Sequence, residues 1–113
     1  MNTTVLSALA EPTRLRIVEL LRDDPALTVG DIAKQLELRL PQTSKHLRVL
    51  TDAGLVRMQA DANRRIYSLR KEPLHELDDW LATFIKEKKE QYERLDGLIA
   101  RVKAERDGRR EKE

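Results

Sequence analysis

The sequence predicts a mainly α-helical fold that carries one two-stranded β-wing, and three observations lead to this prediction. Apolar residues recur at spacings of three and four over most of the chain before residue 54, as they do on one face of a helix. Between residues 56 and 69 the spacing changes to two, which is typical of strands. From Pro73 onward the helical spacing returns. A length of 113 residues allows one domain and an extension.

Two helices are expected in the first part of the chain. Val5, Leu6 and Leu9 predict a short first helix. Pro12 begins a second helix, because proline fits the first helical turn, and the run 23–25 ends it. This second helix is predicted to be central, because its apolar residues are too many for one narrow stripe: Leu15, Ile17, Val18, Leu20 and Leu21.

A third and a fourth helix follow each other closely. Thr28 and Asp31 have the spacing of a capping box at the start of the third helix. The inner face of the third helix consists of Ile32, Ala33 and Leu36. A few residues later, Pro41 begins a helix over 41–53. Gly54 ends that helix by supplying a left-handed residue. Two helices this close predict a helix–turn–helix.

The helix over 41–53 has two different faces. Thr43, Leu47 and Leu50 fall at i, i+4 and i+7 and form a buried stripe. The other face carries hydrogen-bond donors and no carboxylate: Gln42, Ser44, Lys45 and Arg48. Such a face can contact bases and phosphates, so this helix is predicted to be the recognition helix of a DNA-binding protein.

The segment after Gly54 predicts the wing. Its first strand alternates apolar and polar residues over 56–60, and 65–69 resumes the pattern. Asp61 and Asn63 at the tip fit a turn, because both residue types tolerate positive φ. The complete order of elements, α-α-α-α-β-β-α, is that of a winged helix–turn–helix that dimerises through its terminal helices. Its parts are a DNA-binding domain over 1–72, one or more dimerisation helices over 73–107, and a disordered charged tail over 108–113.

The distribution of charge supports a nucleic-acid surface. Residues 39–70 hold seven Lys and Arg against two Asp, a net charge of +5, whereas the rest of the chain carries −3. Basic residues concentrated in one segment are what a phosphate-binding surface requires. His46 lies beside the buried stripe, where it either packs or contacts the DNA backbone. The residues expected to contact DNA are Arg39, Gln42, Thr43, Ser44, Lys45, His46, Arg48, Arg57, Asn63, Arg64 and Arg65.

Composition argues against other classes of protein. The chain has no cysteine, so it lacks disulfides, thiolate metal sites and cysteine catalysis. It also lacks a glycine-rich phosphate loop, and its two histidines are distant in sequence, so neither an enzyme nor a cofactor is expected. The sequence shows no signal peptide and no apolar run long enough to cross a bilayer. We therefore expect a cytoplasmic protein with no membrane partner.

Several consecutive motifs resemble one family of bacterial repressors. The stretches 9–17, 44–50, 53–56 and 64–69 are similar, in register, to the ArsR/SmtB family, and the similarity spans about residues 5–85. The stretch 73–81 resembles the metal-independent, SdpR-like branch. The resemblance implies a homodimeric repressor, and in that branch an autorepressor, whose paired recognition helices bind an imperfect palindrome.

The resemblance also bears on metal binding. Metal-sensing relatives carry Cys-Val-Cys where this chain has Thr28, Val29 and Gly30, so both ligands are missing. At a second site of the family this chain has only His75, with Glu76 and two aspartates nearby. These groups either bind zinc across a dimer interface or form a solvated acidic first turn, which the helix dipole favours. We expect the second, and therefore no metal.

The apolar residues of the terminal helices predict a homodimer. A chain this small needs a second copy to bury such a stripe. Beyond the charged run 86–90, the residues Tyr92, Leu95, Leu98, Ile99 and Val102 either extend the seam as a coiled coil or fold back on the domain. Trp80 and Phe84 either line a pocket for an apolar effector or form a dimer contact, and we expect the dimer contact. The alternative function is a protein-interaction module without specific DNA recognition. The expected dimer contacts are Val5, Leu6, Leu9, Leu77, Trp80, Leu81 and Phe84.

Overall fold

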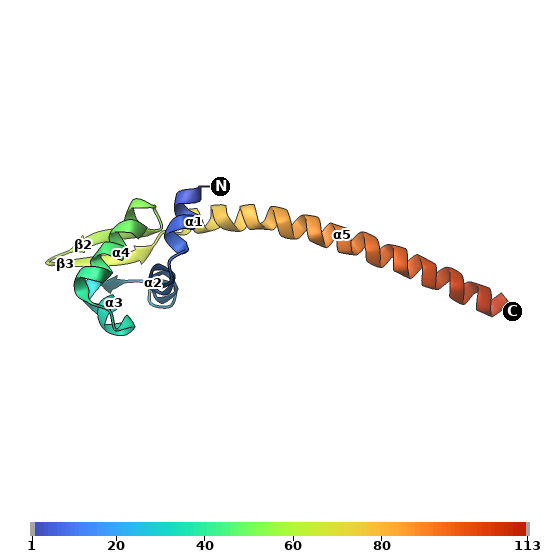
Figure 1. Ribbon diagram of the computed structural model, residues 1–113, viewed down its shortest axis with the longest axis horizontal. Helices are drawn as coiled ribbons and strands as arrows, with labels where there is room; N and C mark the ends of the chain where they lie inside the picture. Colours follow the sequence, from blue (N-terminus) through green and yellow to red (C-terminus); the bar gives the residue numbers. More distant parts are fainter. Residues whose placement is uncertain (1, 113) are drawn as a thin grey trace. The chain divides into compact units, whose positions relative to one another are not determined.

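The structure, a computed structural model, describes the backbone of residues 2–112 and the side chains of residues 2–86 and 93–106. The chain divides into two compact units, Met1–Leu77 and Asp78–Glu113. Figure 1 shows the elements, which follow in the order α1 (Thr3–Leu9), α2 (Pro12–Asp23), β1 (Leu27–Thr28), α3 (Val29–Leu36), α4 (Leu40–Asp52), β2 (Val56–Asp61), β3 (Arg64–Leu69) and α5 (Lys71–Lys112).

The predicted order of helices and wing is confirmed, with one strand added. The three strands form an antiparallel sheet in the order β1-β3-β2. The hairpin of β2 and β3 is the predicted wing, and β1 adds Leu27 opposite Tyr67 and Thr28 opposite Ile66. A strand of two residues is too short to show a period, so it could not be predicted from the spacing of apolar residues. Its pairing attaches the start of α3 to the wing.

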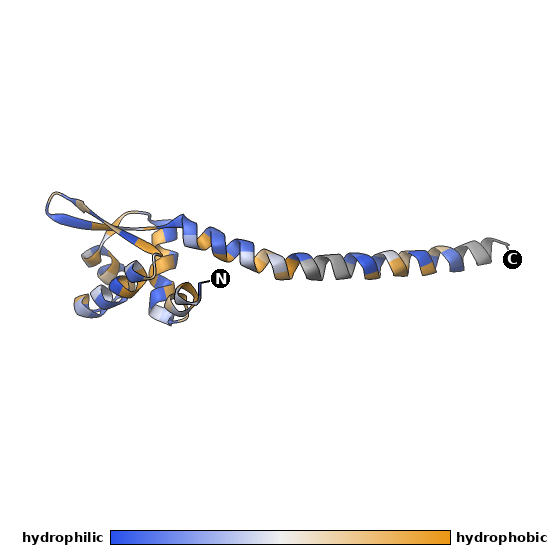
Figure 2. Cartoon of the chain, turned by 90° about the horizontal axis from the view of Figure 1, so that it is seen from above, coloured by the Kyte–Doolittle hydropathy of each residue, from blue (hydrophilic) through white to orange (hydrophobic). Residues whose placement is uncertain are grey.

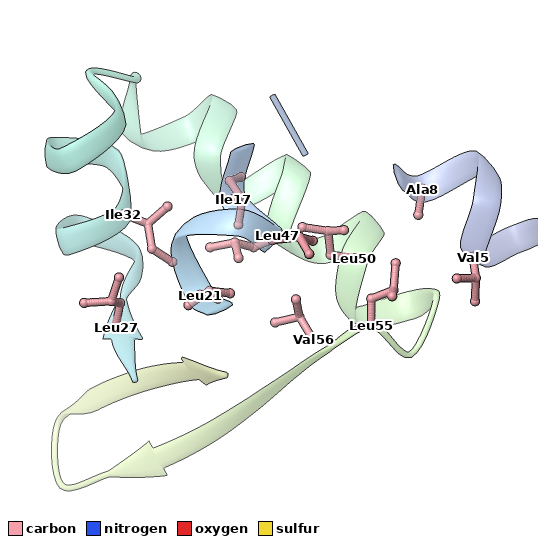
Figure 3. Packing of buried hydrophobic residues seen from close by; sticks show 11 residues of the cluster. Val5, Ala8, Ile17, Leu21, Leu27, Ile32, Leu47, Leu50, Leu55 and Val56 are labelled. Atoms are coloured by element: carbon pink, nitrogen blue, oxygen red, sulfur yellow. The ribbon is translucent and has the colours of Figure 1, made fainter. Parts of the chain in front are cut away.

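The core of the first unit lies between α2, α3, α4 and the base of the wing, as Figure 3 shows. Ile17 and Leu21 of α2 are at most 1% exposed, which confirms that α2 is central. Leu15 points away from this core and is 43% exposed, so the excess of apolar residues on α2 is not all buried. The core holds α4 in place through Leu47 and Leu50, both fully buried.

The two helices of the helix–turn–helix, α3 and α4, end in the same way. At α4, Gly54 has φ of 79°, and the N–H of Leu55 donates to the carbonyl of Leu50 over 3.0 Å. At α3, Glu37 has φ of 55°, and the N–H of Leu38 donates to the carbonyl of Ala33 over 2.8 Å. Both arrangements are Schellman motifs, in which glycine is the usual left-handed residue. Glu37 therefore occupies a conformation that a side chain disfavours.

Replacing Glu37 with glycine is expected to raise the free energy of unfolding by about 1 kcal/mol, because glycine adopts the left-handed conformation without steric cost. Urea denaturation of the two proteins measures this difference. The same change at Gln35, an exposed residue inside α3, is expected to lower stability by about 0.5–1 kcal/mol. Equal effects of the two substitutions would contradict the assignment of strain to Glu37.

The C-terminal part of the chain is one helix, α5. It begins at Lys71, so that Pro73 lies in the first turn, where proline needs no amide partner. The backbone is helical through Lys112, although we predicted a disordered tail from residue 108. The residues that follow 103 are mostly Lys, Arg and Glu, which are good helix formers. Glu113 and the side chain of Tyr92 lie outside the described residues. Among those that are described, no helix is long and apolar enough to cross a membrane.

Candidate nucleic-acid interface

The interface is built on α4, which begins without a side-chain cap. The residue before it, Arg39, makes no capping hydrogen bond through its side chain. Instead the Oγ1 of Thr43 donates to the carbonyl of Arg39 over 2.8 Å. Thr43 is fully buried, so our prediction that it contacts DNA is wrong. Its hydroxyl satisfies the backbone where the helix starts, and its methyl group belongs to the core stripe.

The opposite face of α4 is exposed to solvent and carries Gln42, Ser44, Lys45 and Arg48. Among the described residues, none of these four side chains makes a hydrogen bond or ion pair with another side chain. Their amide, hydroxyl, ammonium and guanidinium donors therefore remain available to a ligand. Arg39, Pro41, Gln42 and Lys45 line a shallow hollow of about 380 Å³ at the start of the helix.

His46 points toward α2 instead of this open face. Its side chain is 17% exposed, and its Nδ1 lies 3.7 Å from an Oε2 of Glu11. That carboxylate caps α2, because it accepts the N–H of Arg14 over 2.8 Å. The same hydrogen bond lowers the pKa of Glu11. Of the two possibilities left open by the sequence, the structure favours packing, in which His46 joins α4 to the start of α2.

The register of the wing separates its arginines. Met58 pairs with Tyr67 and Ala60 with Arg65, so these residues share one face of the sheet. Tyr67 packs against the core cluster, which identifies this face as the one on the helix side. Because side chains alternate along a strand, Arg57 and Arg64 lie on the other face. Only one of the three predicted wing arginines is therefore on the same side as α4.

A groove between α4 and the wing brings three predicted residues together. It has a volume of about 330 Å³, and Ser44, Arg48 and Arg65 are among the residues that line it. Thr51 and Val29 also line it and were missed by the sequence analysis. Thr51 stands seven residues after Ser44 and three after Arg48, so helical spacing alone could have placed it on this face. Val29 could not have been found, because its position depends on how α3 packs.

The remaining wing residues lie apart from this groove. Arg57 lines a separate groove of about 570 Å³ together with Arg70 and Lys71. Arg64 is exposed, and its Nη2 lies 3.6 Å from the carboxylate of Asp61.

The turn at the tip of the wing differs from our expectation in detail. We expected that a residue with positive φ in this turn would be Asp61 or Asn63. The residue that has positive φ is instead Ala62, at 55°. A two-residue turn that joins twisted strands needs such a residue at its first position, and that position falls on the alanine. Asn63 follows it and is exposed.

Part of the predicted dimer surface is exposed. Trp80, Leu81 and Phe84 are 36%, 43% and 50% exposed, and the rings of Trp80 and Phe84 meet edge to face with centroids 5.1 Å apart. Leu6, Leu9 and Leu77 are partly exposed. Val5 is 2% exposed and belongs to the core of its own chain, so its assignment to the dimer surface is wrong. The spacing of Val5, Leu6 and Leu9 could not tell which side of so short a helix faces inward.

The residues at the position of the family's thiolate metal site are used in a helix cap. The Oγ1 of Thr28 accepts the N–H of Asp31 over 3.1 Å, and the carboxylate of Asp31 accepts the N–H of Thr28 over 3.2 Å. The predicted capping box is thus confirmed. These hydrogen bonds also lower the pKa of Asp31. Within the described part of the chain, no three His, Asp or Glu side chains come together as a metal site.

Comparisons with known proteins agree with this architecture. A helix–turn–helix domain model matches residues 9–59. The transcriptional repressor SdpR of Bacillus subtilis is 32% identical over 81 residues, which are 72% of this chain and 89% of that protein. The crystal structure of an ArsR family transcriptional regulator superposes with a TM-score of 0.67 and 30% identity, covering 77% of this chain and 89% of the other.

A solution structure from Mycobacterium bovis, described as a homodimeric winged helix–turn–helix DNA-binding domain, has a TM-score of 0.61 and 28% identity, and covers 75% of this chain and 78% of the other. The fold and the relatives together define a helix–turn–helix transcriptional regulator. The chain belongs to the ArsR/SmtB family of winged helix–turn–helix regulators, as its motifs indicated.

Proposed function

We propose that the protein is a homodimeric repressor that binds duplex DNA through α4 and the wing. The observation that carries the proposal is the exposed face of α4 that carries the donors of Gln42, Ser44, Lys45 and Arg48. Two of these residues, Ser44 and Arg48, share a groove with Arg65 of the wing. An α-helix fits the major groove of DNA, where amide and guanidinium groups can read base edges. Lys45 and Arg39 contact phosphate, which positions the helix without specifying sequence.

The wing has two roles in this proposal. Arg65 lies on the helix side of the sheet and contacts the same stretch of DNA as α4. Arg57 and Arg64 lie on the opposite face and bind the phosphate backbone beyond the groove that α4 occupies. Asn63 stays at the tip, where it contacts the sugar–phosphate backbone.

Dimerisation supplies the second recognition helix. The exposed apolar residues Leu81 and Phe84 need a partner, and the related domain from M. bovis is described as homodimeric. A two-fold dimer binds an imperfect palindrome whose half-sites are about one helical turn apart. Repression, rather than activation, is supported by the name of SdpR. We propose neither a metal nor an enzymatic role, and we place the protein in the cytoplasm with its DNA.

Fluorescence anisotropy tests this proposal. The full chain is titrated into labelled DNA from upstream of its own gene, with a scrambled duplex as the control, over a series of salt concentrations. We expect saturable binding of two subunits to the native duplex, with log affinity falling by about 0.9 per log unit of salt for each neutralised phosphate. Failure to bind either duplex at low salt would exclude DNA binding and favour the protein-interaction module.

A further inference from the structure

A groove at the base of the wing holds a cluster of charged residues outside the recognition helix. Its volume is about 570 Å³, which is within the range of sites for small molecules. Figure 2 shows hydrophilic residues at the start of α5 next to apolar residues at the base of the wing, where this groove lies. The polar residues that line it include Arg57, Ser68, Arg70, Lys71 and Glu72.

Positive charge predominates in this groove. Arg57, Arg70 and Lys71 are exposed cations, and Glu72 is the one carboxylate among the residues that line it, so the lining has a net charge of +2. Within the described part of the chain, Arg57 and Lys71 form no ion pair. These two cations are therefore available to an anion.

The third cation, Arg70, is held in position by its neighbours. Its backbone N–H donates to the carbonyl of Leu55 over 2.9 Å, and its Nε lies 3.8 Å from an Oε2 of Glu72. Its Nη1 lies over the turn at Gly54, 3.8 Å from the point where a Cβ of that residue would stand. A side chain that is already ordered loses less conformational freedom when a ligand binds. Arg70 is therefore suited to anchor an anion.

The donors and the charge of the groove fit a phosphate group. Guanidinium groups bind phosphate through pairs of parallel N–H bonds, and a lysine adds a point charge. Ser68 pairs with Arg57 across the two strands, is half-buried and adds a hydroxyl donor. A phosphate monoester carries close to two negative charges at neutral pH, which matches the net charge of the lining.

Apolar side chains beside the cations favour a small organic ester over the backbone of DNA. Leu69 is half-buried and Met58 is 43% exposed, and both line the groove. Contacts to the DNA backbone are made mainly by hydrogen-bond donors, whereas sites for small molecules combine apolar surface with a few polar groups. The groove has both parts.

We propose that Arg57, Arg70 and Lys71 bind the phosphate group of a small organic phosphate monoester, whose carbon part contacts Met58 and Leu69. The bound ester withdraws Arg57 from DNA and thereby lowers the affinity for the operator. Met58 also lines the groove between α4 and the wing, so the ligand lies beside the DNA-binding surface. Binding of the ester is independent of the proposed function, whereas its effect on DNA rests on that function.

Isothermal titration calorimetry of the full chain with phenyl phosphate tests the site in the absence of DNA. Phenol is the control without a phosphate group, and sodium sulfate is the control that has a similar charge and no carbon. We expect saturable binding of one phenyl phosphate per chain, weaker binding of sulfate and no binding of phenol. No binding of phenyl phosphate would overturn the proposal, and equal affinities for sulfate and phenyl phosphate would show an adventitious ion only.

Three variants assign the binding to this groove. Arg70→Ala is expected to weaken binding of phenyl phosphate at least about tenfold, because a charged hydrogen bond is lost. Arg22→Ala also removes an arginine that pairs with a neighbouring carboxylate, and it is expected to leave binding unchanged. Glu72→Gln removes the carboxylate that competes for Arg70, so it is expected to tighten binding about two- to fivefold. Misfolding cannot produce tighter binding, and equal affinities for all three variants would overturn the proposal.

Anisotropy titrations of the upstream duplex, at constant ionic strength, test the effect on DNA. Saturating phenyl phosphate is expected to lower the affinity of the wild-type chain at least about tenfold and to have a smaller effect on Arg70→Ala. Without the ester, Arg70→Ala is expected to lose less DNA affinity than Lys45→Ala; an equal loss would show that DNA phosphates fill the groove and would overturn the proposal.

The proposal and the proposed function can fail separately in these measurements. If the chain binds the duplex but gives no heat with phenyl phosphate, the ligand site is wrong and the proposed function stands. If phenyl phosphate binds and the duplex does not, the proposed function is wrong and the site stands. If both bind and neither affects the other, the withdrawal of Arg57 from DNA is wrong.

Discussion

Replacing Leu47 with alanine is expected to lower the free energy of unfolding by about 2–5 kcal/mol. Leu47 is fully buried and belongs to the cluster that joins α4 to α2 and the base of the wing. Truncation leaves a cavity that rigid neighbours fill only in part. Urea denaturation followed by far-ultraviolet circular dichroism measures the loss. A loss this large would leave little of the stability that is usual for a small domain.

The control for this substitution is Leu40→Ala, which makes the same chemical change at the start of the same helix. Leu40 is 52% exposed, so the expected change in stability is within about 0.5 kcal/mol. Similar losses at the two positions would contradict the packing of α4 described above.

Replacing Lys45 with alanine is expected to weaken binding to every DNA sequence to the same extent. Its ammonium group lies on the open face of α4, where binding to a phosphate gives affinity without sequence preference. The slope of log affinity against log salt becomes shallower by about 0.9 for each phosphate that the variant no longer neutralises. Anisotropy titrations of operator and scrambled duplexes over a range of salt concentrations measure both quantities.

Gln42→Ala gives the matching contrast on the same face. If Gln42 reads a base edge, removing its amide relaxes the base preference at one position of the operator. For a good bidentate pair this loss is about 1–3 kcal/mol. The slope of log affinity against log salt stays unchanged. Arg22→Ala serves as a charge control, because Arg22 lies at the end of α2 and pairs with Asp23 over 2.9 Å. Binding that survives the removal of both Lys45 and Gln42 would disprove the assignment of α4 as the recognition helix.

The sequence was sufficient where a feature depends on a strong local period. The buried stripe of α4 and the alternation of the wing follow from the spacing of a few apolar residues, and the cap of α3 follows from Thr28 and Asp31. These patterns are local, so the structure reproduces them. For the same reason the family could be identified from motifs alone.

Features that depend on packing between distant segments could not be predicted. His46 and Glu11 are far apart in sequence, and only the packing of α4 on α2 brings them within 3.7 Å. Val5 faces inward because α1 packs on the first unit's own core. The left-handed conformation of Glu37 carried no sequence signal, since the usual residue in that place is glycine.

The two adjacent arginines of β3 make the wing tolerant of a shift in strand register. A slip of one residue moves every side chain of a strand to the other face of its sheet. In the observed register Arg65 lies on the helix side and Arg64 on the far side. After such a slip the two would exchange places, and each face would still carry a guanidinium. The positive charge beside the groove therefore depends little on the exact alignment of β3. The packing of Tyr67 and Leu69 against the core depends on that alignment much more strongly.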